Sequence, residues 1–337
     1  MKKKARLLLS NGSSYEGFAF GFEGNVSGSL TCDCTMIGYT EVLTDPAYYN
    51  QLLVMTYPII GNYGMPCEAL WESPQITPKA VIVHDYTPDY SHWNAASSLG
   101  EAMHKEHVVG ICGIDTHAIT KELLQTPELT ARIEIVGKEN EAELTPQEVR
   151  ANTKVVKAKG SSKILLADLG IKRSTLQFLK ELGISYEVAH TAQSDTIAPY
   201  RALIVAGEGG GTTPVSLART LLAEALTEKL PIYAAAQGYD LLSEIIGAEL
   251  QHNQMIHHSL SEPILKIGTQ QCHIISNSHR TSVVESTLPE GYQPLFKYLN
   301  GNENAGYISS NGSVIATTFL PNNSEMAFLL KSITSLK

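Results

Sequence analysis

The stretch that decides the fold of the second half is 202–240, which reads ALIVAGEGGGTTPVSLARTLLAEALTEKLPIYAAAQGYD. Two short apolar runs, 202–206 and 232–236, flank a segment, 215–228, whose apolar residues recur at helical spacing. The apolar stripe consists of Ala218, Leu221, Leu222, Ala225 and Leu226. A strand, a helix and a second strand in this order predict a βαβ unit with parallel strands.

The same alternation continues on both sides of this unit. The other expected elements are strands at 164–167 and 186–189 and helices at 175–182 and 240–246. Short buried strands that alternate with helices are typical of a parallel sheet covered on both faces, so the expected class is α/β. After Gly247 the pattern turns β-rich, with a hairpin about 310–312 and a last helix near 324–333.

The first half is predicted to be β-rich with mixed connections. An Asn11-Gly12 turn separates two alternating runs and predicts a β-hairpin. The expected strands are 7–9, 15–20, 52–56 and 80–84, and the expected helices are 99–106 and 118–124.

The length of the chain predicts two domains, and the distribution of charge indicates where the boundary between them lies. A chain of 337 residues is typical of two domains. Residues 1–150 carry 10 basic and 19 acidic side chains, whereas residues 151–337 carry 15 of each. The segment 151–162 is rich in Lys, Ser and Gly, and we expect it to link domain 1–150 to domain 163–337.

Composition excludes several classes of protein. With 43% hydrophobic and 18% charged residues, the chain is not disordered, collagenous or a coiled coil. A net charge of −9 argues against binding to nucleic acid or to anionic membrane surfaces. No apolar run predicts a membrane span or an export signal. Five scattered cysteines form no paired framework, which is typical of a reducing compartment, and we expect a cytoplasmic protein.

Two loops should meet at the carboxyl edge of the predicted sheet, where ligands bind in open α/β folds. The first, 207–211, could present backbone N–H groups to an anion or oxyanion, although a flexible connection would explain the same glycines. The second, 234–238, has the small residues of the strand-to-helix turn that holds the nucleophile in several hydrolase folds. Its apex is Ala236, and an alanine cannot act as a nucleophile.

Cysteine and histidine form no convincing catalytic or metal site. Cys272 lies beside His273, but adjacent strand residues point to opposite faces, so we favour a buried structural thiol. Five histidines fall in the same region of the sequence: His252, His257, His258, His273 and His279. Their spacing matches no zinc site, so we expect neither a metal nor a cofactor.

Three acidic residues of the first half could form an acid–base set. They are Glu41, Asp45 and Asp115. Because Asp45 precedes a proline and Asp115 precedes a predicted helix, we favour capping roles for both aspartates.

Four motifs carry a family resemblance: 35–46 (TMIGYTEVLTDP), 56–64 (TYPIIGNYG), 113–116 (GIDT) and 168–173 (DLGIKR). Together they resemble the small subunit of carbamoyl-phosphate synthetase over nearly the whole chain. The resemblance implies a β-rich first domain that docks on a large synthetase subunit, and a flavodoxin-like class I glutamine amidotransferase domain. In that family a Cys-His-Glu triad hydrolyses glutamine, and the ammonia serves the large subunit in arginine and pyrimidine synthesis.

The resemblance breaks down at the catalytic triad. The family's Gly-Ile-Cys-Leu-Gly-His-Gln elbow aligns with 234–240, so Ala236 stands at the nucleophile position. The family's His-Pro-Glu aligns with Leu320-Pro321-Asn322, so the base and its carboxylate are missing too. Loss of the nucleophile or base costs a comparable hydrolytic triad about a million-fold in kcat, so we expect no glutamine hydrolysis.

The glutamine pocket implied by the resemblance is altered as well. Thr35, Gly207 and Gly209 still match it. The changed positions are Gln237, Asp240, Ser278, Arg280 and Thr281. Arg280 replaces a glycine, and we expect its side chain to fill the pocket and oppose glutamine binding.

Three functions are compatible with these residues. The first is a pseudo-glutaminase that serves as a structural or regulatory partner of the large subunit. The second is a glutamine amidotransferase with Cys272 as an unorthodox nucleophile. The third is a free-standing module whose altered pocket, with Arg280 and Glu208, binds another small ligand. An anionic metabolite would suit Arg280 and the 207–211 loop.

Overall fold

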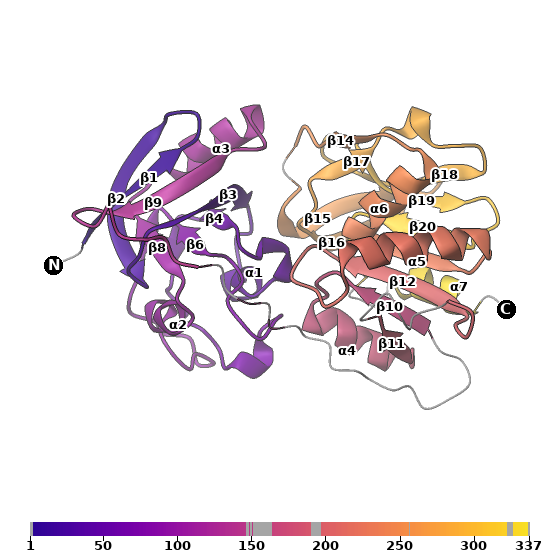
Figure 1. Ribbon diagram of the computed structural model, residues 1–337, viewed down its shortest axis with the longest axis horizontal. Helices are drawn as coiled ribbons and strands as arrows, with labels where there is room; N and C mark the ends of the chain where they lie inside the picture. The colour runs from indigo at the N-terminus through magenta and orange to yellow at the C-terminus, as the bar shows by residue number, and fades with distance from the viewer. Residues whose placement is uncertain are drawn as a thin grey trace. The chain divides into compact units, whose positions relative to one another are not determined.

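The computed structural model describes residues 3–145, 148, 150, 164–189, 197–255, 257–321 and 326–335. The chain forms two compact units, Met1–Arg150 and Ala151–Lys337, which are described separately below (Figure 1). The expected linker 151–162 and the expected start of the last helix, 324–325, lie outside the described residues. Within the described ranges, no helix is long and apolar enough to cross a membrane.

The first unit is built on a closed barrel with the strand order β1-β2-β8-β6-β4-β3-β9. Its strands are β1 (Lys4–Leu9), β2 (Ser14–Gly21), β3 (Val26–Asp33), β4 (Leu52–Met55), β6 (Ala80–Ile82), β8 (Val109–Cys112) and β9 (Thr130–Ile135). The predicted hairpin is the antiparallel pair β1–β2, and β1 also pairs with β9, which closes the barrel. The other two expected strands of this half are β4 and β6.

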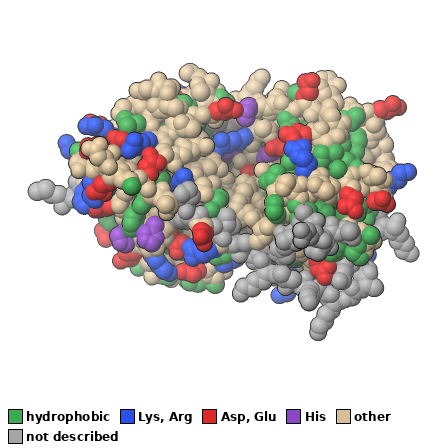
Figure 2. All heavy atoms as spheres, in the orientation of Figure 1, with side chains coloured by type: hydrophobic (Ala, Val, Ile, Leu, Met, Phe, Trp, Pro, Cys, Tyr) green, Lys and Arg blue, Asp and Glu red, His purple; other side chains and the backbone are tan. Residues whose placement is uncertain are grey.

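Short helices and loops cover the barrel. They include α1 (Tyr39–Leu43), η1 (Pro46–Tyr48), η2 (Glu68–Leu70), α2 (Leu99–Lys105) and α3 (Thr116–Gln125), and a separate pair of strands, β5 (Ile59–Ile60) and β7 (Asp85–Tyr86). Both expected helices, α2 and α3, are present. Figure 2 shows basic and acidic side chains interspersed over the visible face of this unit, so its acidic excess forms no single patch there.

The predicted capping roles of Asp45 and Asp115 are confirmed. The Asp45 carboxylate accepts a hydrogen bond from the backbone N–H of Ala47 at 3.0 Å, at the start of η1. The Asp115 carboxylate accepts one from Ala118 at 3.0 Å, at the start of α3. Each carboxylate satisfies an N–H group that has no partner within its own helix.

The second unit contains a nine-stranded sheet in the order β11-β10-β12-β13-β20-β19-β18-β15-β16. Its parallel part comprises β10 (Ile164–Asp168), β11 (Tyr186–Val188), β12 (Ala202–Gly207), β13 (Ile232–Ala236) and β20 (Val314–Thr317). In chain order these five strands run 2-1-3-4-5, which is the flavodoxin-like order. The α/β class and the four predicted parallel strands are confirmed.

Helices cover both faces of this sheet and create two hydrophobic cores. One core contains side chains of α4 (Arg173–Glu181) and α7 (Ala327–Ser335), and the other contains side chains of α5 (Val215–Thr227) and α6 (Gln237–Ile246). The predicted stripe of α5 supplies four fully buried side chains: Ala218, Leu221, Leu222 and Ala225.

The antiparallel half of the sheet follows α6 in the sequence. It contains β15 (Ser259–Lys266), β16 (Cys272–Asn277), β18 (Tyr292–Tyr298) and β19 (Asn304–Ser309), while β14 (Leu250–His252) pairs apart with β17 (Thr281–Val283), which η3 (Glu285–Thr287) follows. The hairpin expected about 310–312 joins β19 to β20. The β-rich pattern predicted after Gly247 is therefore confirmed.

Candidate active site

The turn from β13 into α6 has a strained backbone at its apex. Ala236 has φ 56° and ψ −120°, although it is not a glycine. It is 2% exposed and pairs in register with Gly207 of β12. Non-glycine residues rarely adopt positive φ, and such strain is concentrated at functional sites. The second unit thus has the backbone of a nucleophile elbow, with a methyl group where the reactive atom would be.

Close packing explains the glycine two residues later. A Cβ atom on Gly238 would lie 2.3 Å from the carbonyl oxygen of Val205, which is far inside van der Waals contact. A side chain at this position would therefore push the first turn of α6 away from β12. The sharpness of the elbow depends on this glycine.

The glycine-rich loop after β12 packs against the loop after β10. A Cβ on Gly207 would lie 2.4 Å from the nitrogen of Gly170, and one on Gly211 would lie 2.2 Å from the carbonyl oxygen of Asp168. The N–H of Gly209 donates to the carbonyl of Leu169 at 2.6 Å. The glycines therefore allow close backbone approach at the point where strand order reverses, and the Gly209 N–H is already used.

A buried histidine lies between two carboxylates beside this loop. His279 is 6% exposed. Its Nδ1 lies 3.0 Å from Oε1 of Glu208, and its Nε2 lies 3.0 Å from Oδ1 of Asp240. The hydroxyl of Thr281 donates to the same Asp240 oxygen at 2.6 Å. We call these four residues the His279 cluster.

The His279 cluster holds its imidazole in the charged form. Desolvation by burial opposes the charge, but Asp240 and Glu208, through their charges and hydrogen bonds, outweigh it and raise the pKa of His279 to about 10. An imidazolium donates from both ring nitrogens, which matches the two carboxylate partners. At neutral pH this histidine is therefore not available as a general base.

The structure brings together only part of the predicted pocket. Asp240 and Thr281 touch, through the hydroxyl–carboxylate hydrogen bond. Gln237, Ser278 and Arg280 are half-buried. The buried side chain that meets both Glu208 and Asp240 is the neighbouring His279.

The structure describes one of the two other positions that the resemblance places in the triad. Leu320 is half-buried and packs against the hydrophobic core that contains α4 and α7. Asn322 lies outside the described residues. In the first unit, Thr35 is 5% exposed and its backbone N–H donates to the side chain of Asp33 at 2.8 Å.

The prediction that Cys272 is buried is wrong. Its thiol is exposed because β16 is the edge strand of the sheet and Cys272 is its first residue. His273 points differently and packs edge-on against Phe296, with ring centroids 6.3 Å apart.

The other histidines assemble no metal site among the described residues. His257 is fully buried and lies between two carboxylates, 2.9 Å from Glu262 and 3.4 Å from Glu303. Its ring stacks on Tyr298 at 3.7 Å. The two carboxylates therefore have a structural partner in His257.

Sequence reasoning missed the central role of His279. It noted this histidine only as one of five, and Glu208 only as a ligand contact. One signal is present in the sequence: His279 lies inside the segment 278–281, where the resemblance predicts the glutamine pocket. The pairing itself depends on β12, α6 and β16 coming together, which no local pattern encodes.

Each half of the chain matches the model of a known protein family. Residues 7–133 match the family model of the carbamoyl-phosphate synthase small chain, CPSase domain. Residues 165–325 match the model of class-I glutamine amidotransferases.

Similar proteins cover nearly the full length. The chain is 31% identical to the carbamoyl phosphate synthase arginine-specific small chain of Eremothecium gossypii, over 95% of this chain and 87% of that protein. It is 32% identical to the protein of the same name from Aspergillus oryzae, over 95% of this chain and 76% of that protein. The protein of the same name from Neurospora crassa is 30% identical to this chain, over 94% of this chain and 75% of that protein. With this agreement along both units, the chain belongs to the carbamoyl-phosphate synthase small-chain family.

Proposed function

We propose that this chain is a small subunit that does not hydrolyse glutamine and that acts as a structural or regulatory partner of a synthase large subunit. The observation that carries the proposal is Ala236 at the apex of a strained elbow. The backbone of a nucleophile site is present, but the side chain has no atom that can attack an amide carbon.

The other site residues support the same function. Leu320 packs into the hydrophobic core, and a leucine cannot accept the proton that a nucleophile must lose. Asp240, where the family has a pocket glutamine, is bound to His279 and Thr281. Thr35, Gly207 and Gly209 are then remnants of a glutamine site.

The domain roles follow from the family. We assign docking on the large subunit to residues 1–150, treat 151–162 as the linker, and assign the inactive amidotransferase domain to 163–337. The relatives are named arginine-specific, which favours arginine over pyrimidine synthesis as the pathway served. A reduced cytoplasm suits the five free cysteines.

The test compares ammonia with glutamine as nitrogen donor. The purified chain, mixed with the large subunit from its own genome, should form a complex that makes carbamoyl phosphate from ammonia and not from glutamine. Glutamate release should stay at the level of a no-enzyme control. Release of glutamate at a normal enzymatic rate, or failure of the two chains to associate, would contradict the proposal.

A variant that restores only the nucleophile tests whether the rest of the active site is still functional. Ala236→Cys restores the attacking sulfur but neither the base nor the pocket. We expect no glutaminase activity from it, because members of a catalytic triad act as a unit. Activity in Ala236→Cys would show that the rest of the site is competent.

Cys272 provides the test of the remaining enzymatic alternative. It is exposed at a sheet edge, and Cys272→Ala should change no activity of the complex. The anion-binding alternative is weakened by the engagement of Glu208 with His279, which the ligand would have to displace.

A further inference from the structure

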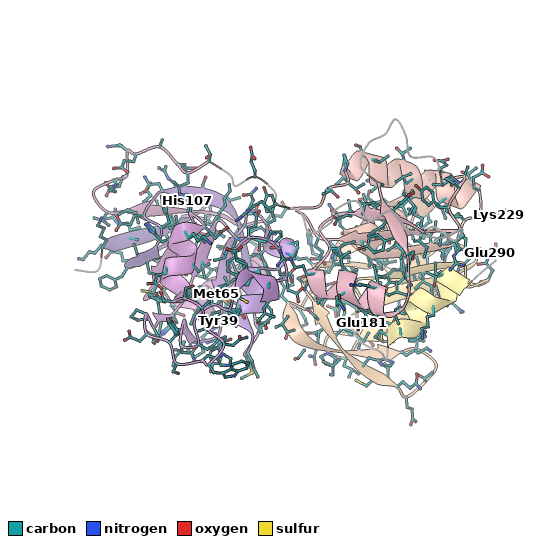
Figure 3. All side chains as sticks on the ribbon, turned by 90° about the horizontal axis from the view of Figure 1, so that it is seen from below. Tyr39, Met65, His107, Glu181, Lys229 and Glu290 are labelled. Atoms are coloured by element: carbon teal, nitrogen blue, oxygen red, sulfur yellow. The ribbon has the colours of Figure 1, made fainter. Side chains whose placement is uncertain are left out.

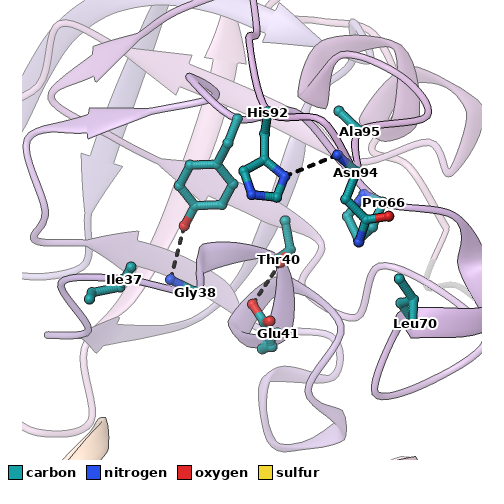
Figure 4. Close-up of a pocket in the computed structure, with 10 residues that line it drawn as sticks. Ile37, Gly38, Thr40, Glu41, Pro66, Leu70, His92, Asn94 and Ala95 are labelled. Atoms are coloured by element: carbon teal, nitrogen blue, oxygen red, sulfur yellow. Dashed lines mark hydrogen bonds between the residues drawn. The ribbon is translucent and has the colours of Figure 1, made fainter.

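A pocket of about 440 Å³ lies within the first unit. It is formed by α1 with the two residues before it, by the segment after β5 and by the segment 92–95 (Figure 4). Its polar side chains include Glu41 and His92, and its apolar walls include Ile37, Pro66 and Leu70. Neither the family resemblance nor the proposed function assigns a role to it.

Tyr63 gives the pocket a fixed aromatic wall. Its hydroxyl accepts hydrogen bonds from the backbone N–H groups of Gly38 and Tyr39, at 2.9 and 3.0 Å. Its ring stacks on that of Tyr39, with centroids 4.1 Å apart and an angle of 24°. Tyr39 is buried and lies near Met65 in the interior of the unit (Figure 3). The wall is therefore held in place before any ligand binds.

His92 adds a second ring at an angle to the first. Its centroid lies 6.1 Å from that of Tyr63, and the two planes are inclined by 60°. Its Nδ1 accepts a hydrogen bond from the backbone N–H of Asn94 at 3.2 Å, which fixes the orientation of the ring (Figure 4). The face of the Tyr63 ring offers π electron density to a cation, and the His92 ring forms an adjacent wall of the pocket.

Glu41 supplies the charge. Its Oε2 accepts a hydrogen bond from the hydroxyl of Thr40 at 2.6 Å, which restrains the carboxylate at the pocket (Figure 4). Among the described residues, no Lys, Arg or His lies within ion-pair distance of Glu41 (salt bridges within 4.0 Å are all made by other residues). The carboxylate is thus a charged acceptor without a basic counterpart in this part of the chain.

We propose that this pocket binds a small organic cation, with a guanidinium or primary ammonium group on a short apolar stem. The charged head pairs with Glu41 and faces the rings of Tyr63 and His92, and the stem lies against Ile37 and Leu70. A carboxylate combined with aromatic faces and apolar walls suits this chemistry, because guanidinium groups form bidentate bonds with carboxylates and stack on rings. An anionic ligand would be repelled by Glu41.

The test uses ethylguanidinium and its uncharged isostere ethylurea as probes. Methyl NMR spectra of the full chain, labelled at Ile and Leu, are recorded at low ionic strength during titration with each probe. Ethylguanidinium should shift the methyl signals of Ile37 and Leu70 with a dissociation constant on the order of 1 mM. Ethylurea should bind at least tenfold more weakly. Equal shifts from both probes, or shifts elsewhere only, would overturn the proposal.

Variants of Glu41 and His92 test whether the carboxylate and the ring contribute to binding. Glu41→Gln should weaken ethylguanidinium binding at least tenfold and remove the preference over ethylurea, whereas Glu128→Gln, an exposed carboxylate of the same unit, should leave both unchanged. His92→Ala should weaken binding several-fold, which tests the site independently if Glu41→Gln alters the fold. Unchanged methyl signals of Leu7 and Ile133, which are buried in the barrel of the same unit, serve as the folding control. Unaltered binding in both site variants would show that the pocket is not the site.

Discussion

Replacing His279 by glutamine removes the positive charge between Glu208 and Asp240. The two carboxylates are only 12% and 24% exposed, so water compensates them poorly. Breaking a buried pair of this kind typically costs about 3–5 kcal/mol, and we expect His279→Gln to lower the free energy of unfolding by about 3 kcal/mol. Urea denaturation measures the change. The matched control is His252→Gln, an exposed histidine, which should change stability by less than about 0.5 kcal/mol.

Adding Glu208→Gln to the His279→Gln variant provides a check on the cause. The second substitution removes one of the two like charges, so the double variant should be more stable than additivity predicts, by about 1 kcal/mol or more. Strict additivity would mean that charge is not the reason for the loss.

The same cluster makes the stability of the second unit depend on pH. The pKa of His279 is raised from an unfolded value near 6.5 to about 10. The native protein therefore holds one more proton than the unfolded chain between these values. Its stabilising contribution is complete below pH 6.5 and is lost as pH rises through 10, with a slope of up to about 1.4 kcal/mol per pH unit.

Denaturation series from pH 6 to 10 measure this slope. The decrease in the free energy of unfolding with rising pH should be absent in His279→Gln and present in His252→Gln. A stability that is flat over this range in the unmodified chain would contradict the assigned charge state.

The residue scale also shows what sequence can and cannot predict. The proposed loss of the nucleophile rests on the identity of one residue, Ala236, and the capping roles of Asp45 and Asp115 follow from local turn chemistry. The burial of Cys272 was predicted wrongly because an apolar residue type says nothing about whether its strand lies at an edge. The His279 cluster was not predicted because its members come from separate parts of the chain: the segment after β12, α6, the β16–β17 connection and β17.

At the scale of elements, the elbow itself can be tested. Ala236 has a positive φ that glycine adopts without strain, so Ala236→Gly relieves strain while it loses a buried methyl group. Ala235, the preceding residue of β13, is equally buried but is not among the residues with positive φ. Ala235→Gly removes no backbone strain, so we expect this variant to be less stable than Ala236→Gly by about 1–2 kcal/mol.

Thermal and urea unfolding of the two variants give the comparison. Because both replacements delete one methyl group from the same strand, transfer and entropy terms largely cancel. Equal losses would mean that the elbow carries no strain.

Strands were predicted best where their burial is uniform. The four predicted parallel strands of the second unit are fully buried or nearly so, and continuous apolar runs identify them. In the barrel, β3 has Gly28 and three serine or threonine residues within eight positions, so its sequence resembles a loop. Barrel closure supplies the pairing that the local sequence does not favour.

At the scale of the whole molecule, the charge of the first unit bears on docking. Residues 1–150 hold the entire net charge of −9, but acidic and basic groups are interspersed on the face that Figure 2 shows. A dispersed excess acts at long range and raises the rate of encounter more than the strength of the final complex. If this unit is the docking domain, as proposed, and it meets a basic surface of the large subunit, association should slow as ionic strength rises.

Charge reversal in one unit at a time tests this dependence. Asp89→Lys with Glu128→Lys changes two exposed acids of the first unit, and Glu228→Lys with Glu290→Lys makes the same change in the second unit. Stopped-flow association at low salt should be altered several-fold by the first pair and little by the second. The difference should vanish near 0.5 M salt, where the screening length is a few ångströms. A larger effect from the second pair would place the docking surface in residues 163–337, because screening makes charges near the docking surface affect association more than distant ones.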